Sequence, residues 1–351
     1  MSGPPAAVNK EIKQPIHPSM LPLLDPQYVA FHNKHLAHLT PPHTIPWDAK
    51  KIREGPAVPG GSVPLEVGVV KDFEIPESKG SPKLKVRTYT PKGEKPEGGW
   101  DVFVFFHGGG WTLGDIGSEA AFCTNMCVRA NCVVVSVDYR LGPENPYPAA
   151  VEDAVDALQW LYNHGEEALN INKERIIVGG SSSGGNLAAI LAVKSKSLSP
   201  TPIQINFQLL VVPVTDNTAS VSTRSGWAKN QYTPWLSPAR MEWFKSKYLP
   251  NEEDWTKWDA SPLFATKELL QPGTQPGKNK PGAWIGVCEL DILSEEGVEF
   301  GEKLRDAGWE VEVEVYKGAP HPIMAMDGVL DIGKKLVSDA AAALKKAFES
   351  L

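Results

Sequence analysis

The chain has 351 residues, of which 42% are hydrophobic and 22% are charged, and its formal net charge is −7. This composition is that of an ordinary globular protein. The acidic balance disfavours nucleic acid as a partner, because phosphate binding needs clustered positive charge and the chain has no basic run.

No apolar run approaches the roughly 20 residues that cross a bilayer, and the N-terminus lacks the apolar core of a signal peptide. Three of the four cysteines lie close together in one short segment, unlike a disulfide framework. We therefore expect a cytoplasmic protein with no membrane span and with reduced, buried thiols. The oligomeric state stays open, with a homodimer among the states that the sequence permits.

The first part of the chain is rich in proline and histidine, with one weak helical pattern over residues 25–40. Residues 65–75 and 83–91 then alternate between apolar and polar side chains, as half-buried antiparallel strands do. Residues 101–108 and 132–139 are continuous apolar runs, typical of strands that are covered on both faces.

Helices and strands alternate in the rest of the chain. Helices are predicted over residues 118–131, 147–165, 183–197, 294–308 and from about 324, and strands over 175–180, 205–214, 283–290 and 310–318. This alternation predicts one α/β domain with a mostly parallel sheet and helices on both faces. We expect it to comprise residues 61–214 and 252–351, preceded by an N-terminal segment (1–60) and interrupted by an aromatic-rich insertion (215–251).

A candidate nucleophile follows the strand at 175–180. The run from Gly180 to Gly184, GSSSG, fits the pattern G-x-S-x-G between a buried strand and a helix. In such a turn the middle serine, here Ser182, is presented above the sheet, and the helix start supplies N–H groups for a developing negative charge. The alternative interpretation is a glycine-rich turn whose serines cap the helix.

A second motif, HGGGW from His107 to Trp111, stands at the end of another buried strand. Consecutive glycines leave backbone N–H groups open to an approaching anion. An oxyanion hole needs such donors for the tetrahedral intermediate of acyl transfer. The alternative is a flexible loop.

A serine nucleophile needs a base and an acid, and in this fold they follow it in the order acid, then histidine. His321 is the only histidine downstream of Ser182, so it is the candidate base. Four carboxylates at or after the end of the preceding strand are candidates for the acid: Glu289, Asp291, Glu295 and Glu296. The last two fall in the first turn of a predicted helix, where the dipole stabilises negative charge anyway.

Four stretches in chain order, HGGGW, VDYRLGPENPYPAAVEDA, GGSSSGGNLAA and YLPNEEDWTKWDASPLFA, resemble the hormone-sensitive-lipase-like esterases of the α/β-hydrolase superfamily. The similarity extends over residues 102–321. It implies an α/β-hydrolase fold with a central sheet of about eight strands and a helical cap. Ser181 and Ser183 stand where these esterases usually have aspartate and alanine.

The resemblance implies a serine carboxylic ester hydrolase that acts on small to medium acyl esters through an acyl-enzyme. It favours Asp291 as the acid beside Ser182 and His321, and the N–H groups of Gly109, Gly110 and Ser183 as the oxyanion hole. We expect the triad to need no metal and no organic cofactor. In the resembling family the stretch with Asp138, Arg140 and Glu144 shapes the loop behind the oxyanion glycines, so it is interpreted as structural.

The substrate pocket is expected under a lid made by the insertion and the N-terminal segment, with Trp111, Trp227 and Trp235 as candidate wall residues. Two further clusters are interpreted as structural. His32, His35 and His38 are spaced three apart and drift around a helix, so they do not form a closed set of zinc ligands. Cys123 and Cys127 are small buried hydrophobes.

Two other functions remain open on the sequence. The same triad could cleave an amide or lactam bond. Gibberellin receptors resemble this family as well, and a non-catalytic receptor of that type binds a small molecule in the former active site. Such a receptor can lose the base, whereas His321 is present in this chain.

Overall fold

The computed structural model describes residues 11–55, 58–77, 82–273 and 280–351. Parts of the predicted N-terminal segment (1–10 and 56–57) and of the predicted α/β domain (78–81 and 274–279) therefore lie outside the described residues. In the described part, eight strands form one sheet in the order β1-β2-β4-β3-β5-β6-β7-β8. The strands are β1 (Val69–Ile75), β2 (Leu84–Thr90), β3 (Trp100–Phe106), β4 (Val133–Asp138), β5 (Ile171–Ser181), β6 (Phe207–Val211), β7 (Gly282–Cys288) and β8 (Glu310–Tyr316).

The sheet is parallel except at one edge. Strand β1 pairs antiparallel with β2, and β2 pairs antiparallel with β4. Every pair from β4 to β8 is parallel, and the register sets Phe106 of β3 against Gly180 of β5. The ends of these two strands therefore lie side by side, which brings the HGGGW motif next to the serine turn.

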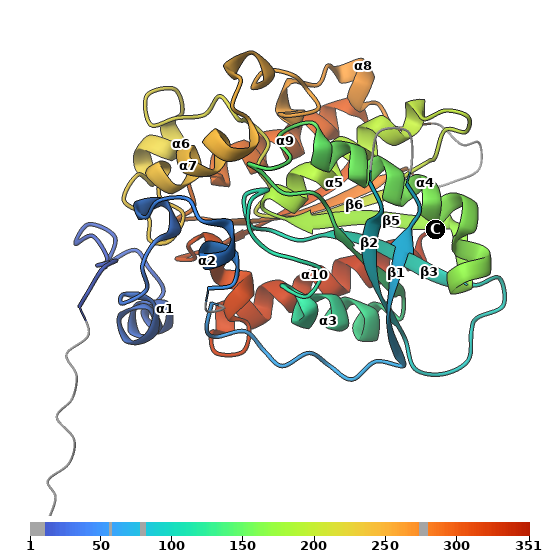
Figure 1. The fold of residues 1–351 in the computed structure, drawn as a ribbon, viewed down its shortest axis with the longest axis horizontal. Helices are drawn as coiled ribbons and strands as arrows, with labels where there is room; N and C mark the ends of the chain where they lie inside the picture. The colour runs from blue at the N-terminus through green and yellow to red at the C-terminus, as the bar shows by residue number, and fades with distance from the viewer. Residues whose placement is uncertain (1–10, 56–57, 78–81, 274–279) are drawn as a thin grey trace, which may run out of the picture.

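Helices cover both faces of the sheet, as the alternation predicts (Figure 1). Helices α3 and α10 lie on one face, and α4, α5 and α9 lie on the other. The helical elements are α1 (Pro26–Phe31), η1 (His32–Leu36), η2 (Pro42–Thr44), α2 (Ala49–Arg53), α3 (Ala120–Ala130), α4 (Ala149–Leu169), α5 (Ser183–Lys194), η3 (Ser195–Ser197), α6 (Ser225–Lys229), α7 (Pro238–Tyr248), η4 (Glu252–Asp254), η5 (Pro262–Phe264), α8 (Lys267–Leu270), α9 (Ser294–Ala307), η6 (His321–Met326) and α10 (Asp331–Glu349). Strands β3 and β4 are buried almost throughout.

Two helix boundaries differ from the prediction. Helix α4 does not stop at Gly165 but continues to Leu169, and Asn170 ends it in the left-handed conformation (φ 55°). Gly165 instead provides space for the side chain of Ile171, which a Cβ at this position would meet at 2.6 Å. Helix α10 begins at Asp331 rather than near Met324, because residues 321–326 form the separate turn η6.

The N-terminal helices α1 and α2 lie at the same end of the molecule as α6 and α7 of the insertion (Figure 1). The Trp47 and Trp243 rings are 5.9 Å apart and join the two segments. Arg53 ties the N-terminal segment to the core, since its guanidinium donates to the carbonyl of Thr112 (2.9 Å) and pairs with Glu144 (2.6 Å).

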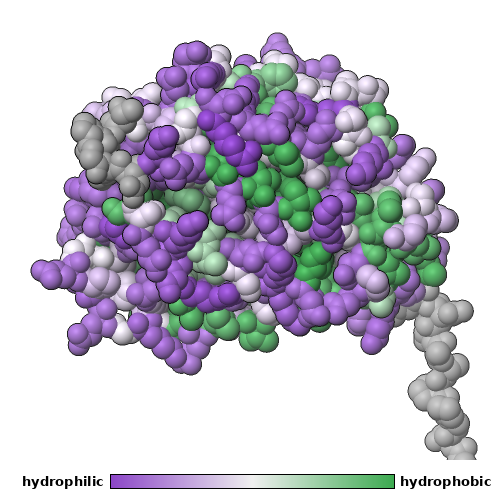
Figure 2. Space-filling model, turned by 180° about the vertical axis from the view of Figure 1, so that it is seen from behind, coloured by the Kyte–Doolittle hydropathy of each residue, from purple (hydrophilic) through white to green (hydrophobic). Residues whose placement is uncertain are grey.

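The surface shown in Figure 2 is mixed in polarity, and the four cysteines lie in the interior. On the face shown in Figure 2, apolar side chains form small groups that polar side chains separate. Among the described residues, no helix combines the length and the apolar character that crossing a membrane requires. Cys123, Cys127, Cys132 and Cys288 are all free and buried.

Candidate active site

The turn between β5 and α5 presents one serine out of three. Ser181 and Ser183 are buried, with 3% and 0% of their surface exposed, whereas Ser182 is partly exposed. Ser182 has a φ of 53°, a backbone conformation that residues other than glycine rarely adopt. A Cβ at Gly184 would overlap the carbonyl oxygen of Phe106, so only glycine permits this close approach to β3. The strained conformation therefore serves to expose the Ser182 hydroxyl.

Ser182, His321 and Asp291 lie within hydrogen-bonding distance of one another in series. The Ser182 Oγ is 3.0 Å from His321 Nε2, and His321 Nδ1 is 2.6 Å from Asp291 Oδ2. An imidazole protonated on Nδ1 satisfies both contacts, because it donates to the carboxylate and accepts from the hydroxyl. This arrangement can deprotonate a serine while the carboxylate fixes the tautomer of the base.

Asp291 is held in place from two sides. Its Oδ1 accepts the N–H of Leu293 (3.1 Å), and its backbone carbonyl accepts the side-chain amide of Asn230 from the insertion (2.8 Å). Only 1% of Asp291 is exposed. The carboxylate therefore has little freedom other than to bind His321.

The other three candidate carboxylates have different partners. Glu289 accepts the N–H of Gly318 (2.9 Å), and Glu295 accepts the hydroxyl of Ser225 (2.8 Å). Glu296 is buried and accepts the N–H of Thr215 (2.8 Å); burial raises its pKa to about 8. Each of these side chains braces a loop or a helix start, and among the described residues none of them forms a hydrogen bond with the imidazole, whose nitrogens contact Asp291 and Ser182.

The glycine loop after β3 lies next to the serine turn. Gly109 and Gly110 have φ values of 123° and 60°, so both adopt the left-handed region that favours glycine. A Cβ at Gly110 would overlap the ring of Phe244 from α7. In the part of the chain that the structure describes, the N–H groups of Gly109, Gly110 and Ser183 have no protein acceptor, so they remain available to an oxyanion.

Glu119 is a site residue that the sequence did not reveal. Its carboxylate accepts the hydroxyl of Ser181 (2.7 and 2.9 Å) and the N–H of Gly108 (3.3 Å). Burial raises its pKa to about 7, while these hydrogen bonds act in the opposite direction. The N–H of Gly108 is thus already bound, in contrast to those of the next two glycines. In the sequence, the one sign of such a carboxylate partner was Ser181, which stands where related esterases usually have aspartate.

The three tryptophans that we considered as pocket walls have distinct surroundings. Trp111 is fully buried and stacks on Tyr248, with ring centroids 4.7 Å apart, and Trp227 is 1% exposed. Neither has a face that solvent reaches. Trp235 is partly exposed and lies beneath the guanidinium of Arg240. A role of these residues in binding substrate remains a prediction.

The three N-terminal histidines make separate contacts. His32 Nε2 binds the carbonyl oxygen of Gln14 (2.7 Å), His35 stacks on Phe31, and the Nδ1 atom of His38 lies 3.0 Å from the carbonyl oxygen of Glu11. These contacts hold the N-terminal segment together.

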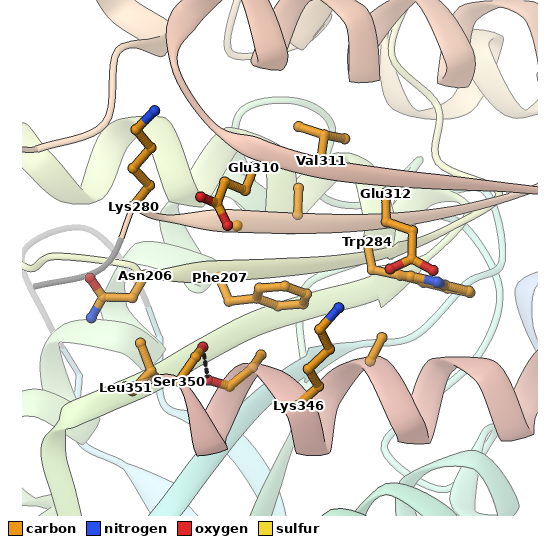
Figure 3. A pocket seen from close by; sticks show the side chains of 14 residues that line it. Asn206, Phe207, Lys280, Trp284, Glu310, Val311, Glu312, Lys346, Ser350 and Leu351 are labelled. Atoms are coloured by element: carbon orange, nitrogen blue, oxygen red, sulfur yellow. Dashed lines mark hydrogen bonds between the residues drawn. The ribbon is translucent and has the colours of Figure 1, made fainter.

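One cavity among the described residues lies elsewhere. It has a volume of about 310 Å³ between the first residues of β6, β7 and β8 and the end of α10, and Phe207, Trp284 and Lys346 are among its walls (Figure 3). The serine turn follows the last residues of β5, and β5, β6 and β7 are parallel. The cavity therefore lies at the amino-terminal ends of the strands, whereas Ser182 lies at their carboxyl-terminal ends, so the cavity does not belong to the site.

Comparisons with known proteins identify the family of this chain. A family model for the α/β-hydrolase fold matches residues 103–325. An AB hydrolase superfamily protein of Schizosaccharomyces pombe, C1039.03, is 43% identical over 95% of this chain and 97% of its own length. An ethyl acetate hydrolase of Pseudomonas putida is 29% identical over 83% of this chain and 87% of its own. The crystal structure of a thermostable esterase from Pseudomonas putida has a TM-score of 0.78 and 30% identity, covering 93% of this chain and 98% of that one.

Proposed function

Because this chain belongs to the α/β-hydrolase fold family and is a carboxylesterase-like serine hydrolase, we propose that it cleaves small to medium acyl esters with Ser182, His321 and Asp291 as its catalytic triad. The observation that carries this proposal is the pair of hydrogen bonds that joins Ser182 to His321 (3.0 Å) and His321 to Asp291 (2.6 Å). The similarity to an ethyl acetate hydrolase supports short esters among the substrates.

The reaction proceeds in two steps. In the first, Ser182 Oγ attacks the ester carbonyl carbon while His321 takes the hydroxyl proton and then passes it to the departing alkoxide. The C–O bond of the ester breaks, the alcohol leaves, and the acyl group remains on Ser182. In the second, His321 takes a proton from water while the oxygen of that water attacks the acyl carbon; the bond between the acyl carbon and Ser182 Oγ then breaks, His321 returns the proton to Ser182 Oγ, and the carboxylic acid is released.

The negative charge that forms on the carbonyl oxygen needs donors already in place. The free N–H groups of Gly109, Gly110 and Ser183 are suited to this role, because they require no rearrangement at the moment of reaction. Phe244 packs on Gly110 and restrains the loop that carries two of these donors. Asp291 stabilises the imidazolium that exists during both steps.

The insertion fits the role of a cap over this site. Its residues Asn230 and Thr233 donate hydrogen bonds to backbone carbonyls at Asp291 and Leu290, so it is anchored to the loop that bears the acid. A receptor that only binds its ligand would need neither a base nor an oriented carboxylate, and both are assembled here.

Hydrolysis of p-nitrophenyl esters from acetate to long acyl chains, by the wild type and by Ser182→Ala, tests the proposal. We expect turnover by the wild type, an optimum at short or medium chains, and a loss of about 10³-fold or more in the variant. Equal rates in the two proteins would contradict the assignment of Ser182. A folded wild type that cleaves no ester would contradict the proposed activity.

A further inference from the structure

Arg240 is a buried cation in an unfavourable place. It is the third residue of α7, after the N-cap Ser237, and only 6% of its surface is exposed. Positive charge in the first turn of a helix opposes the helix dipole, and burial removes most of the side chain from water. Burial lowers its pKa to about 10, so the side chain still carries its charge at neutral pH.

In the described part of the chain, no carboxylate forms an ion pair with this charge, because no aspartate or glutamate side chain there is close enough to Arg240. The Nη1 atom of Arg240 instead donates to the backbone carbonyl of Trp235 (3.2 Å). The segments outside the described residues, 1–10, 56–57, 78–81 and 274–279, contain neither aspartate nor glutamate. Their side chains cannot supply the missing counter-ion. A buried charge without a counter-ion is destabilising, so a ligand that supplies the opposite charge would stabilise this site.

The surroundings of Arg240 are aromatic or neutral. The guanidinium carbon lies 4.6 Å from the centre of the Trp235 ring and 5.9 Å from that of Phe244. Burial raises the pKa of Tyr28 and lowers that of His43, so both neighbours are neutral at pH 7. Arginine has five N–H donors. Water can reach the Arg240 nitrogens that have no protein acceptor. The fully buried side-chain nitrogens and oxygens without a hydrogen-bond partner in the described residues all belong to other residues.

The position of Arg240 links this charge to the active site. Phe244, one helical turn further along α7, packs directly on Gly110 of the glycine loop. The guanidinium therefore lies just beyond the ring that covers a proposed oxyanion donor. Its N–H groups form a planar fork that matches the two oxygens of a carboxylate.

We propose that Arg240 binds a carboxylate of the substrate, so that the enzyme acts on esters that carry a free carboxylate in addition to the ester bond. This inference rests on the proposed function, because it names the substrate class of the same site. Arg240 would hold the anionic end while Ser182 attacks the ester carbonyl.

Two matched substrate pairs test the inference. Mono-p-nitrophenyl adipate and its methyl ester differ only in an acyl-side carboxylate, and 4-carboxyphenyl and 4-carbamoylphenyl butyrate differ in an alcohol-side carboxylate. For each pair the readout is the ratio of kcat/KM for the acid to kcat/KM for the neutral ester, corrected for spontaneous hydrolysis. A charge-assisted hydrogen bond predicts that in at least one pair this ratio falls roughly 10- to 100-fold in Arg240→Gln.

Lys247→Gln is the matched control, because it removes one positive charge from the same helix at a partly exposed position over Trp47. Its ratios should stay at the wild-type values. Ratios unchanged in Arg240→Gln, or lowered equally in Lys247→Gln, would overturn the inference, since a merely structural arginine would affect both members of a pair alike.

A binding measurement decides the matter if Arg240→Gln does not fold or if no ester is cleaved. Calorimetric titration of Ser182→Ala with monomethyl adipate and with dimethyl adipate requires no turnover. We expect the monoacid to bind at least about tenfold more tightly; equal affinities would contradict the role of Arg240. Tight binding of the monoacid by a protein that cleaves no ester would refute the proposed function alone.

Discussion

The hydroxyl of Ser181 donates a hydrogen bond to the carboxylate of Glu119, with Oγ 2.7 Å from Oε1, directly beside Ser182. The same carboxylate oxygen accepts the N–H of Gly108 (3.3 Å). One side chain thus joins the serine turn to the glycine loop. The resembling esterases usually have aspartate before the nucleophile, whereas here a residue 62 positions upstream brings the carboxylate to that place.

Replacing Glu119 by glutamine should change how stability depends on pH. Burial raises the pKa of Glu119 from an ordinary 4.5 to about 7. A carboxyl group whose pKa is raised by folding adds stability that is complete below the unfolded pKa and is lost as the pH rises through the folded pKa. Ionisation of Glu119 should therefore lower the unfolding free energy of the wild type by up to about 3 kcal/mol as the pH rises from 4.5 to 7.

Denaturant unfolding of both proteins at pH 4.5, 6 and 8 measures this effect. Glu119→Gln lacks the titrating group, so the difference in unfolding free energy should move in favour of the variant as the pH rises. Glu54→Gln removes a carboxylate from an exposed position and is the control. Parallel pH profiles for Glu119→Gln and the wild type would show that folding does not shift this titration.

Asp291→Asn should lower kcat while leaving KM nearly unchanged. Asparagine keeps the shape of the side chain but cannot fix the Nδ1–H tautomer or stabilise the imidazolium, and comparable substitutions reduce kcat by about 10⁴. Steady-state kinetics with p-nitrophenyl acetate provides the measurement. Glu289→Gln is the matched control, because its carboxylate binds the N–H of Gly318 instead of His321. A comparable loss in Glu289→Gln would mean that the acid has been misassigned.

Sequence patterns located most of the candidate site because its parts are local. The serine turn, the glycine loop and His321 each follow a strand, and parallel strands bring their ends to one edge of the sheet. The prediction of the α/β-hydrolase fold is confirmed by the family match and by the eight-stranded sheet. The catalytic roles themselves stay predictions, although the side chains lie where those roles require them.

Other features depend on contacts that no local pattern encodes. Glu119 resembles any helix-flanking acid until the fold brings it against Ser181. Arg240 stands in a helix with charged neighbours, and only the structure shows that it is buried without a carboxylate. The end of α4 was misjudged for a related reason: Gly165 suggested a C-cap, but its lack of a side chain accommodates Ile171.

Gly110→Ala should impair catalysis by displacing an oxyanion donor. The φ of Gly110 is 60°, and an added methyl group would overlap the ring of Phe244. Either the loop or the ring must move, and loss of one oxyanion donor typically costs about 10²–10³ in kcat. Gly93→Ala is the control for backbone strain, since its φ is 100° and nothing lies within 4 Å of the added atom.

The double variant Gly110→Ala/Phe244→Ala separates the clash from the conformational strain. Removing the ring makes room for the methyl group, so the double variant should regain part of the kcat that Gly110→Ala loses relative to Phe244→Ala. Additive effects of the two substitutions on ln kcat would show that Phe244 does not control the position of the loop.

Asp153→Ala should unfold the protein at a markedly lower temperature without a specific effect on chemistry. Asp153 is 1% exposed and accepts both the backbone N–H (2.6 Å) and Nε (2.8 Å) of Arg140, which follows β4. Removing one partner of a buried ion pair costs about 3–5 kcal/mol, and we expect the lower end of this range because Arg140 is 18% exposed and keeps Glu152 as a partner. Thermal and denaturant unfolding measure this loss.

Glu152→Ala is the control. It removes a half-exposed carboxylate that lies 3.1 Å from the same guanidinium, and it should lower the unfolding free energy by at most about 1 kcal/mol. Similar losses in the two variants would mean that burial of the Arg140–Asp153 pair does not determine its contribution.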